Sequence, residues 1–300
     1  MGNTLKIAGK EFKDLLSDRI MLVVVAAFLL YILVDLSHIR DLLASGFFNY
    51  DPNLNQANPA ANLAETMLNQ LTFMLSRYGA ILGIAVGFLS IAGERHSGAL
   101  NALVAKPVTR DAIIVGKTGG ALGFLLCVFA LAAAFLTSGL MILASATIAP
   151  VIVEYAARMP VAVLTALLYT MVFFFLSMAI SLLIDNYAFA LILSLLAWSV
   201  SQLMTSYTFT GYIAAFLGDE KGIGQLIMSL SPDGMIRDIS YNVLGNFRVD
   251  FAGATGLAGF DLQKLLFILN LMGSAVLKLL IILIALAAIA FVAFRRRDIA

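Results

Sequence analysis

Residues 93–117 read GERHSGALNALVAKPVTRDAIIVGK, a charged stretch punctuated by Gly and Pro between two long apolar runs. The chain around it has 300 residues, of which 61% are hydrophobic and 12% charged, and its mean hydropathy is +0.97. Soluble domains average about 45–50% apolar and about 25% charged residues, so this chain has too few charges to cover a water-facing surface. We therefore predict an integral membrane protein in which the quoted stretch is a loop between two spans.

Six apolar runs are long enough to cross a membrane. A spanning helix needs about 20 mainly apolar residues to cross about 30 Å of hydrocarbon, and a helix satisfies its own backbone hydrogen bonds there. The predicted spans are Ile20–Leu36, Leu71–Ala92, Gly119–Ala144, Val161–Ile184, Tyr187–Ser206 and Ser274–Phe294. The sequence thus predicts an all-α membrane protein whose residues 1–300 form a single transmembrane domain.

The placement of Lys and Arg predicts the orientation. With the N-terminus inside, the inner segments carry most of the basic residues, and the two shorter outer loops carry only Arg40 and Arg158. Because basic residues concentrate in cytoplasmic loops, both termini are predicted to be cytoplasmic. The expected location is the plasma membrane of a prokaryote.

Three segments outside the spans have a recognisable character. Residues 1–19 are predicted to form an amphipathic helix on the inner membrane surface, with an apolar face (Leu5, Ala8, Phe12, Leu15 and Leu16) away from its lysines. Residues 49–69 are expected to be a polar outer loop. Residues 207–265 form a long extracytoplasmic segment with two apolar pieces, GYIAAFLG and QLIMSLSP, too short to cross and predicted to be interfacial or re-entrant half-helices.

The sequence argues against a catalytic or metal site. The GKT at Gly116–Thr118 ends like a phosphate-binding loop, but the motif GxxxxGK[ST] needs a glycine where Asp111 stands and a strand before it. Within the spans only Asp35 is acidic, which disfavours a proton- or ion-coupled transporter. A lone cysteine, Cys127, and two distant histidines predict no metal site, and a net charge of +1 argues against a nucleic-acid partner.

The quoted loop has the local signals of a helix, a break and a second helix. Ser97 is a plausible helix cap, and Leu100 and Leu103 share one face of the helix that follows. Pro107 ends this helix and Thr109 can cap the next one. From spacing alone, an ordinary positively charged inner loop explains these features equally well.

A family resemblance gives the loop a function. The order Gly-Glu-Arg, Ser-Gly-x-Leu, Lys-Pro-Val-x-Arg and Gly-Lys resembles the cytoplasmic loop after the second span of type-2 ABC transporter permeases. The nearest likeness is to the subgroup that includes the permease for nitrous-oxide-reductase maturation. The resemblance extends over nearly the whole chain, through the basic amphipathic helix, the six-span layout, LSPDGMIRD at 230–238 and FRRRD at 294–298.

The resemblance implies partners and a coupling site. Such permeases bind no cofactor themselves; two copies of a separate nucleotide-binding subunit hold ATP and Mg, and the permease pairs with a second copy or a related chain. Residues 1–19 would be an elbow helix, and residues 93–118 a cytoplasmic coupling loop with its coupling helix at about 94–105. The implied site residues are Glu94, Arg95, Ser97, Gly98, Leu100, Leu103, Pro107, Arg110 and Lys117.

Gly79, Gly83 and Gly87 form a GxxxGxxxG pattern in the second span. Small residues at this spacing allow helices to approach closely. The pattern predicts either an ordinary helix contact within one chain or a sliding face that transmits movement of the coupling loop.

A polar stripe in the fifth span comprises Ser194, Trp198, Ser201, Gln202 and Thr205. Polar stripes in spans commonly form hydrogen bonds between helices. By the resemblance, the same stripe would line a substrate path between two permease copies.

The leading hypothesis is therefore the non-catalytic membrane subunit of an ATP-driven exporter. The alternative is the same ATPase-driven architecture acting mechanically on an extracytoplasmic partner, with residues 207–265 as the docking site.

Overall fold

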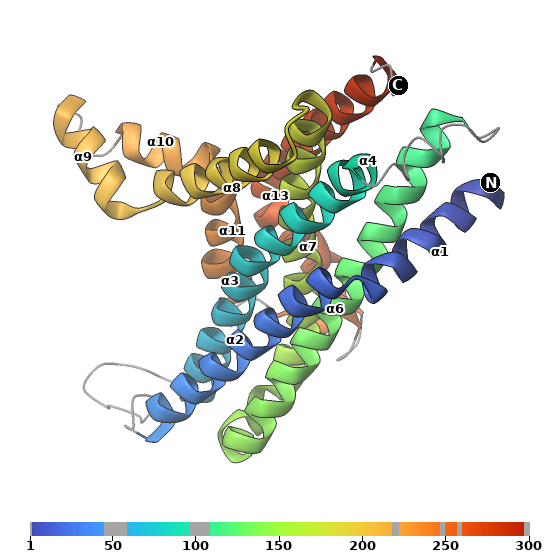
Figure 1. The fold of residues 1–300 in the computed structure, drawn as a ribbon. Coiled ribbons are helices and arrows are strands. Elements are labelled where there is room, and N and C mark those ends of the chain that lie inside the picture. The colour runs from blue at the N-terminus through green and yellow to red at the C-terminus, as the bar shows by residue number, and fades with distance from the viewer. Residues whose placement is uncertain are drawn as a thin grey trace.

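The computed structural model describes residues 2–44, 59–96, 109–217, 222–246, 250–256 and 260–296. Helices make up nearly all of this part of the chain and no strand occurs in it, which confirms the predicted all-α fold (Figure 1). Six helices in it are long and apolar enough to cross a membrane, which confirms the six spans.

The spanning helices are α2 (Arg19–Ala44), α3 (Pro59–Phe88), α6 (Arg110–Ile148), α7 (Ile152–Leu183), α8 (Tyr187–Met204) and α13 (Leu262–Arg296). The shorter helices are α1 (Gly2–Ser17), α4 (Glu94–His96), α9 (Tyr207–Leu217), α10 (Gly222–Leu230), α11 (Pro232–Ile239) and α12 (Phe251–Thr255). Two π-helical turns, η2 (Leu89–Gly93) and η4 (Ser240–Leu244), extend α3 and α11, and a 3-10 turn, η3 (Ala149–Val151), joins α6 to α7.

Several helices are longer than the sequence predicted. Helix α3 begins at Pro59, inside the predicted polar loop, because Leu63 and Met67 lie on a fully buried face that packs into the bundle. Helix α13 begins at Leu262 rather than Ser274. Arg158, expected in an outer loop, lies within α7 with a fully buried side chain.

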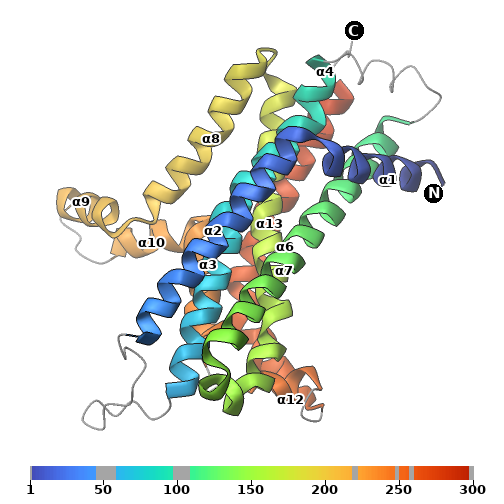
Figure 2. The same ribbon diagram turned by 60° about the horizontal axis from the view of Figure 1, so that its bottom comes forward.

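The two ends of the bundle differ in what they carry. Helix α1, helix α4 and the C-terminal end of α13 lie at one end, which we call the terminal face, and α12 lies at the opposite end, the far face (Figure 2). Helix α8 runs along the outside of the bundle, and α9 and α10 extend to one side of it in both views (Figures 1 and 2).

Helix α7 is the centre of the bundle. It packs most extensively against α3 and α13, and most of its side chains are buried. In contrast, α8 and α13 expose large hydrophobic side chains such as Ile192, Leu196 and Ile281. Exposed apolar surface on this scale is suited to hydrocarbon rather than to water.

Candidate functional site

A buried cluster of charged side chains joins three segments at the terminal face. The Lys117 ammonium of α6 lies 2.8 Å from a carboxylate oxygen of Glu11 in α1 and 2.8 Å from one of Glu94 in α4. Ser90 of η2 donates a hydrogen bond of 2.5 Å to the other Glu11 oxygen. The Lys117 side chain is 1% exposed and that of Glu11 is 7% exposed. We call these four residues the Lys117 cluster. Buried charges are destabilising unless they are paired, so the cluster holds its segments together.

Glycines beside Lys117 allow α1 to pack closely on α6. A Cβ atom at Gly116 would lie 2.7 Å from the Ile7 side chain, and one at Gly120 would lie 2.6 Å from the carbonyl oxygen of Ala8. Contacts this short would push the helices apart. The glycines of the GKTGG sequence at 116–120 therefore allow α1 to pack closely against α6.

The buried face of α1 overlaps the predicted apolar face only in part. Ala8, Phe12 and Leu15 lie on the buried or half-buried side together with Glu11, whereas Leu5 and Leu16 are 73% and 47% exposed. The helix ends at Ser17, and the Asp18 carboxylate then accepts hydrogen bonds of 2.8 and 2.9 Å from the backbone N–H groups of Ile20 and Met21 in the first turn of α2. Helix α1 thus presents one face to α6 and leaves Leu5 and Leu16 exposed beside its lysines.

Arg95 connects α4 to the link between α7 and α8. Its guanidinium donates hydrogen bonds of 2.8 and 3.1 Å to the carbonyl oxygens of Ile184 and Asp185, and it lies 3.7 Å from the Asp185 carboxylate. In the same link, the Asn186 side chain accepts a hydrogen bond from the Phe189 N–H and caps α8. Movement of α4 is therefore coupled to the start of α8.

The beginning of α6 is attached to the end of α13. The Arg295 guanidinium binds both oxygens of the Asp111 carboxylate, with an Nε to Oδ1 distance of 2.8 Å. Arg110 donates a hydrogen bond of 3.0 Å to the Arg295 carbonyl oxygen. These side chains are about half exposed, so the pair is a modest contribution to stability.

Four of the predicted coupling residues thus surround the ends of the segment 97–108. Glu94 and Arg95 precede it, and Arg110 and Lys117 follow it. The other five, Ser97, Gly98, Leu100, Leu103 and Pro107, lie outside the described residues. The sequence did not predict that Glu94, Arg95 and Lys117 bind within the chain, because their partners Glu11 and Asp185 are remote in sequence.

The glycine pattern of α3 lies against α7. A Cβ atom at Gly83 would lie 2.6 Å from the carbonyl oxygen of Thr170, and one at Gly87 would overlap the carbonyl oxygen of Phe174. At Gly79 the neighbours are the side chains of Phe129 and Thr170. The three glycines therefore allow α3 to pack closely against α7 within one chain. This contact lies in the part of α3 that leads through η2 to Glu94.

Two residues of the polar stripe on α8 bind a half-buried carboxylate. Ser201 and Gln202 donate hydrogen bonds to Asp233 of α11, and the Tyr169 hydroxyl of α7 donates a third, of 2.5 Å. Burial raises the pKa of Asp233, and the three hydrogen bonds oppose that rise. Hydrogen bonds between helices were predicted for this stripe, but Asp233 was not identified as their acceptor, because it is distant from the donors along the chain.

The rest of the stripe makes local contacts. The hydroxyl of Ser194 donates to the carbonyl of Ala190, and the Thr205 hydroxyl donates to that of Gln202. Trp198 packs against the core. Within this chain, Ser201 and Gln202 therefore contact α11 and α7, and Ser194 and Thr205 are buried.

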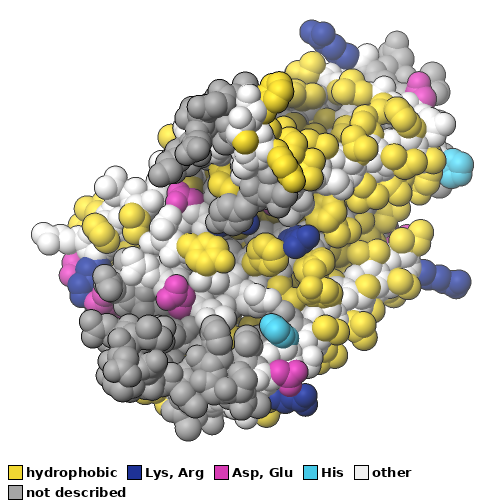
Figure 3. Space-filling model, turned by 90° about the vertical axis from the view of Figure 1, so that its left-hand side faces the viewer, with side chains coloured by type: hydrophobic (Ala, Val, Ile, Leu, Met, Phe, Trp, Pro, Cys, Tyr) yellow, Lys and Arg dark blue, Asp and Glu magenta, His cyan; other side chains and the backbone are white. Residues whose placement is uncertain are grey.

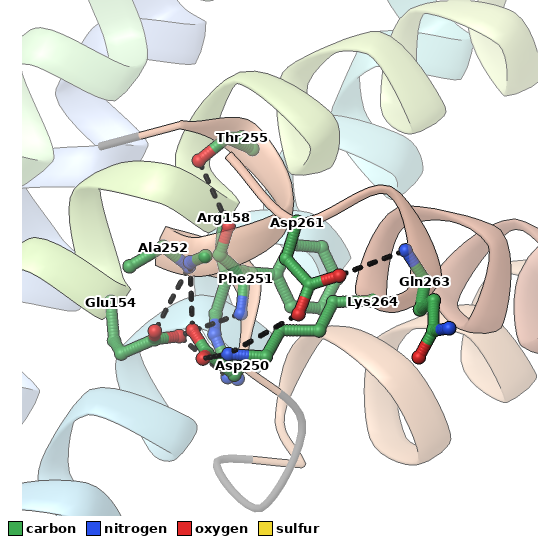
Figure 4. Close-up of polar contacts among 10 residues, drawn as sticks. Glu154, Arg158, Asp250, Phe251, Ala252, Thr255, Asp261, Gln263 and Lys264 are labelled. Atoms are coloured by element: carbon green, nitrogen blue, oxygen red, sulfur yellow. Dashed lines mark hydrogen bonds and ion pairs between the residues drawn. The ribbon is translucent and has the colours of Figure 1, made fainter. Parts of the chain in front are cut away.

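A second ionic cluster holds the far face together (Figure 4). Arg158 of α7 lies 3.0 Å from Glu154 and donates a hydrogen bond of 2.9 Å to the carbonyl oxygen of Leu244. Glu154 also accepts hydrogen bonds of 3.1 and 2.9 Å from the first two backbone N–H groups of α12. Nearby, a hydrogen bond from Lys264 of α13 lowers the pKa of Asp250 to about 2. This cluster attaches α12 to α7 and α13.

In the described part of the chain, no group of three His, Cys, Asp or Glu side chains is placed to hold a metal ion. The polar clusters are therefore joints between helices, and they lie at the ends of the long helices and around α11. A family model described as ABC-2 family transporter protein matches residues 5–299. No curated protein sequence matches the chain.

Proposed function

The chain belongs to the ABC-2 family of transporter proteins, and on that premise we propose that it is the membrane subunit of an ATP-driven exporter. Proteins of this family are multi-pass permease components, generally non-catalytic, that normally work with an ATP-binding subunit. The proposal is that hydrolysis in that separate subunit drives a substrate outward across a prokaryotic plasma membrane. From the sequence resemblance, we also propose that the chain is related to the subgroup that includes the permease for nitrous-oxide-reductase maturation.

We assign the terminal face to the cytoplasm. Lys6, Lys10 and Lys13 of α1 and Arg295 and Arg296 of α13 all lie in segments at this face. The enrichment of basic residues on the cytoplasmic side of membrane proteins supports the assignment. An ATPase in the cytoplasm would then meet α1, α4 and the segment 97–108.

One observation carries the coupling proposal: both ends of the segment 97–108 are anchored in the bundle. Glu94 is bound to Lys117 of α6, which in turn binds Glu11 of α1; Arg95 is bound to the α7–α8 link, and Arg110 is bound to α13. A force applied by the ATPase to the segment between these residues would be passed on to those helices. Through the Lys117 cluster, α1, the proposed elbow helix, would move together with these helices.

The assembly that we propose contains two permease copies and two ATP-binding subunits, with ATP and Mg held by the latter. The cargo path would run between the permease copies, with α3 and α8 in its wall. The candidate lining on α8 comprises Ser194, Trp198, Ser201, Gln202 and Thr205. Lining the path would require the buried Ser194 and Thr205 to become accessible in the assembly.

Affinity capture of the tagged chain from native membranes tests the coupling. We expect an ATPase with an ATP-binding-cassette sequence to be captured in a one-to-one ratio with the permease. Leu100→Asp and Gly98→Trp should each abolish this capture while leaving the amount of folded permease unchanged. Capture of no such ATPase, or undiminished capture by both variants, would contradict the assignment of residues 93–118.

A further inference from the structure

A cavity of about 570 Å³ lies between α10, α11, η4 and α13, beside the C-terminal end of α8. Its lining combines apolar side chains (Met228, Met235 and Ala275) with two cations, Arg237 of α11 and Lys278 of α13. A smaller cavity adjoins it through Arg237 and brings a third cation, Arg77 of α3. None of the contacts that anchor segment 97–108 involves these residues.

The acidic groups of the cavities are already engaged within the chain. Asp233 accepts hydrogen bonds from three donors, and Asp238 accepts one from Asn242. Lys278 donates a long hydrogen bond of 3.4 Å to the Ser229 carbonyl and, within the described residues, forms no ion pair with a carboxylate. Within the described part of the chain, Lys278 therefore has no carboxylate at ion-pair distance, although Asp238 lines the same cavity.

The height of these cations matches the headgroup layer of a membrane. At about 1.5 Å per helical residue, Lys278 lies roughly 27 Å along α13 from Arg296, and Arg77 lies roughly 28 Å along α3 and its extension from His96. Both distances approach the hydrocarbon thickness of about 30 Å. Measured from the membrane surface at the terminal face, the cations thus reach the headgroups of the opposite leaflet.

The surroundings of the cavity are those that an acyl chain requires. Leu203 of α8 and Leu277 and Ile281 of α13 are all more than half exposed. In Figure 3, which faces the α9–α10 side of the molecule, a Lys or Arg side chain lies among hydrophobic side chains near the middle of the view. An amphiphile could therefore place its head in the cavity and its tail along these helices.

We propose that this cavity binds the phosphate-bearing headgroup of an anionic amphiphile, with Arg237 and Lys278 as its cationic partners. Basic pockets between spanning helices are suited to anionic lipid headgroups, and guanidinium groups pair with phosphate through two parallel hydrogen bonds. The occupant that we propose is a lipid of the surrounding leaflet. The site goes beyond the proposed ATPase coupling and can be present without it.

Native mass spectrometry of the purified chain provides the test. The protein is released from micelles containing equal amounts of phosphatidylglycerol and phosphatidylcholine with identical acyl chains, and the ratio of the two in the first bound lipid is measured. We expect wild type to prefer phosphatidylglycerol. Arg237→Gln and Lys278→Gln should each reduce the preference about fivefold, the factor that corresponds to about 1 kcal/mol per basic residue.

Three controls keep the test decisive. Lys278→Arg should retain the preference, and Arg40→Gln, which removes an exposed cation at the end of α2, should leave it unchanged. Inorganic phosphate in excess should not displace the lipid; displacement would show a site for the free anion and overturn the amphiphile assignment. If the Gln variants do not fold, wild type alone decides, because equal binding of the two lipids contradicts the proposal. No ATPase enters the experiment, so its failure is distinct from failure of the coupling proposal.

Discussion

Replacing Lys117 by Met would remove the cation that holds two carboxylates together at the terminal face. The side chain is 1% exposed and lies 2.8 Å from both Glu11 and Glu94, so the variant leaves two negative charges facing each other. Removing one partner of a buried ion pair costs about 3–5 kcal/mol, and we expect a loss of that size here.

Reversible unfolding in mixed detergent and SDS micelles, followed by circular dichroism, would measure this loss. Adding Glu11→Met to Lys117→Met should restore most of the stability. The matched control is Lys10→Met, which removes an exposed lysine 3.5 Å from Asp14 and should cost less than about 1 kcal/mol. Equal effects of the Lys117 and Lys10 variants, or no recovery of stability in the double variant, would contradict this assignment.

Four further predictions concern the other joints. Gly83→Ala should destabilise the protein by about 1–3 kcal/mol in the same unfolding assay, because its Cβ would lie 2.6 Å from a backbone oxygen of α7; Gly211→Ala, with no atom within 4 Å, should be neutral or slightly stabilising. Arg158→Met should cost about 3–5 kcal/mol by leaving Glu154 without its cation, whereas Arg40→Met, at an exposed pair, should cost less than about 1 kcal/mol. Since the pKa of Asp250 is lowered to about 2 in the folded protein, its contribution to stability should be present above about pH 4 and lost as the pH falls through about 2. When the stability of Lys264→Met is measured over the same acid range, the loss should be smaller than in wild type. An identical loss in the two proteins would contradict the pairing. Asp233→Asn should cost about 1–3 kcal/mol because an amide cannot accept from all three donors; an effect no larger than that of the exposed Asp238→Asn would rule this out.

The spans were predictable because a run of apolar residues is by itself sufficient to define one. Their ends were less so: the segment around Leu63 and Met67 in α3 mixes polar and apolar residues, and only packing against the bundle shows that its apolar face continues the helix. Likewise Arg158, a charged residue near Pro160, is typical of a loop, and its place inside α7 depends on Glu154 and on α12.

The candidate site was predictable as a segment but not as a set of contacts. The sequence around Glu94 and Lys117 indicated the coupling loop through its resemblance to known permeases. The second carboxylate bound by Lys117, that of Glu11, lies in a helix more than 80 residues away from either residue. Asp233 was missed for the same reason, since Tyr169 and Ser201 approach it only in three dimensions. Local periodicity finds faces of helices, and it carries no information on which face meets which.

We propose that a separate ATPase binds this permease at the segment 97–108. The most direct measurement places a photo-crosslinking amino acid at Leu100 in native membranes, with the same amino acid at Arg40, an exposed position near the far end of α2, as the control. We predict a cross-link to an ATP-binding-cassette ATPase from position 100 and none from position 40. Absence of that cross-link at position 100, or equal cross-linking from both positions, would contradict the account.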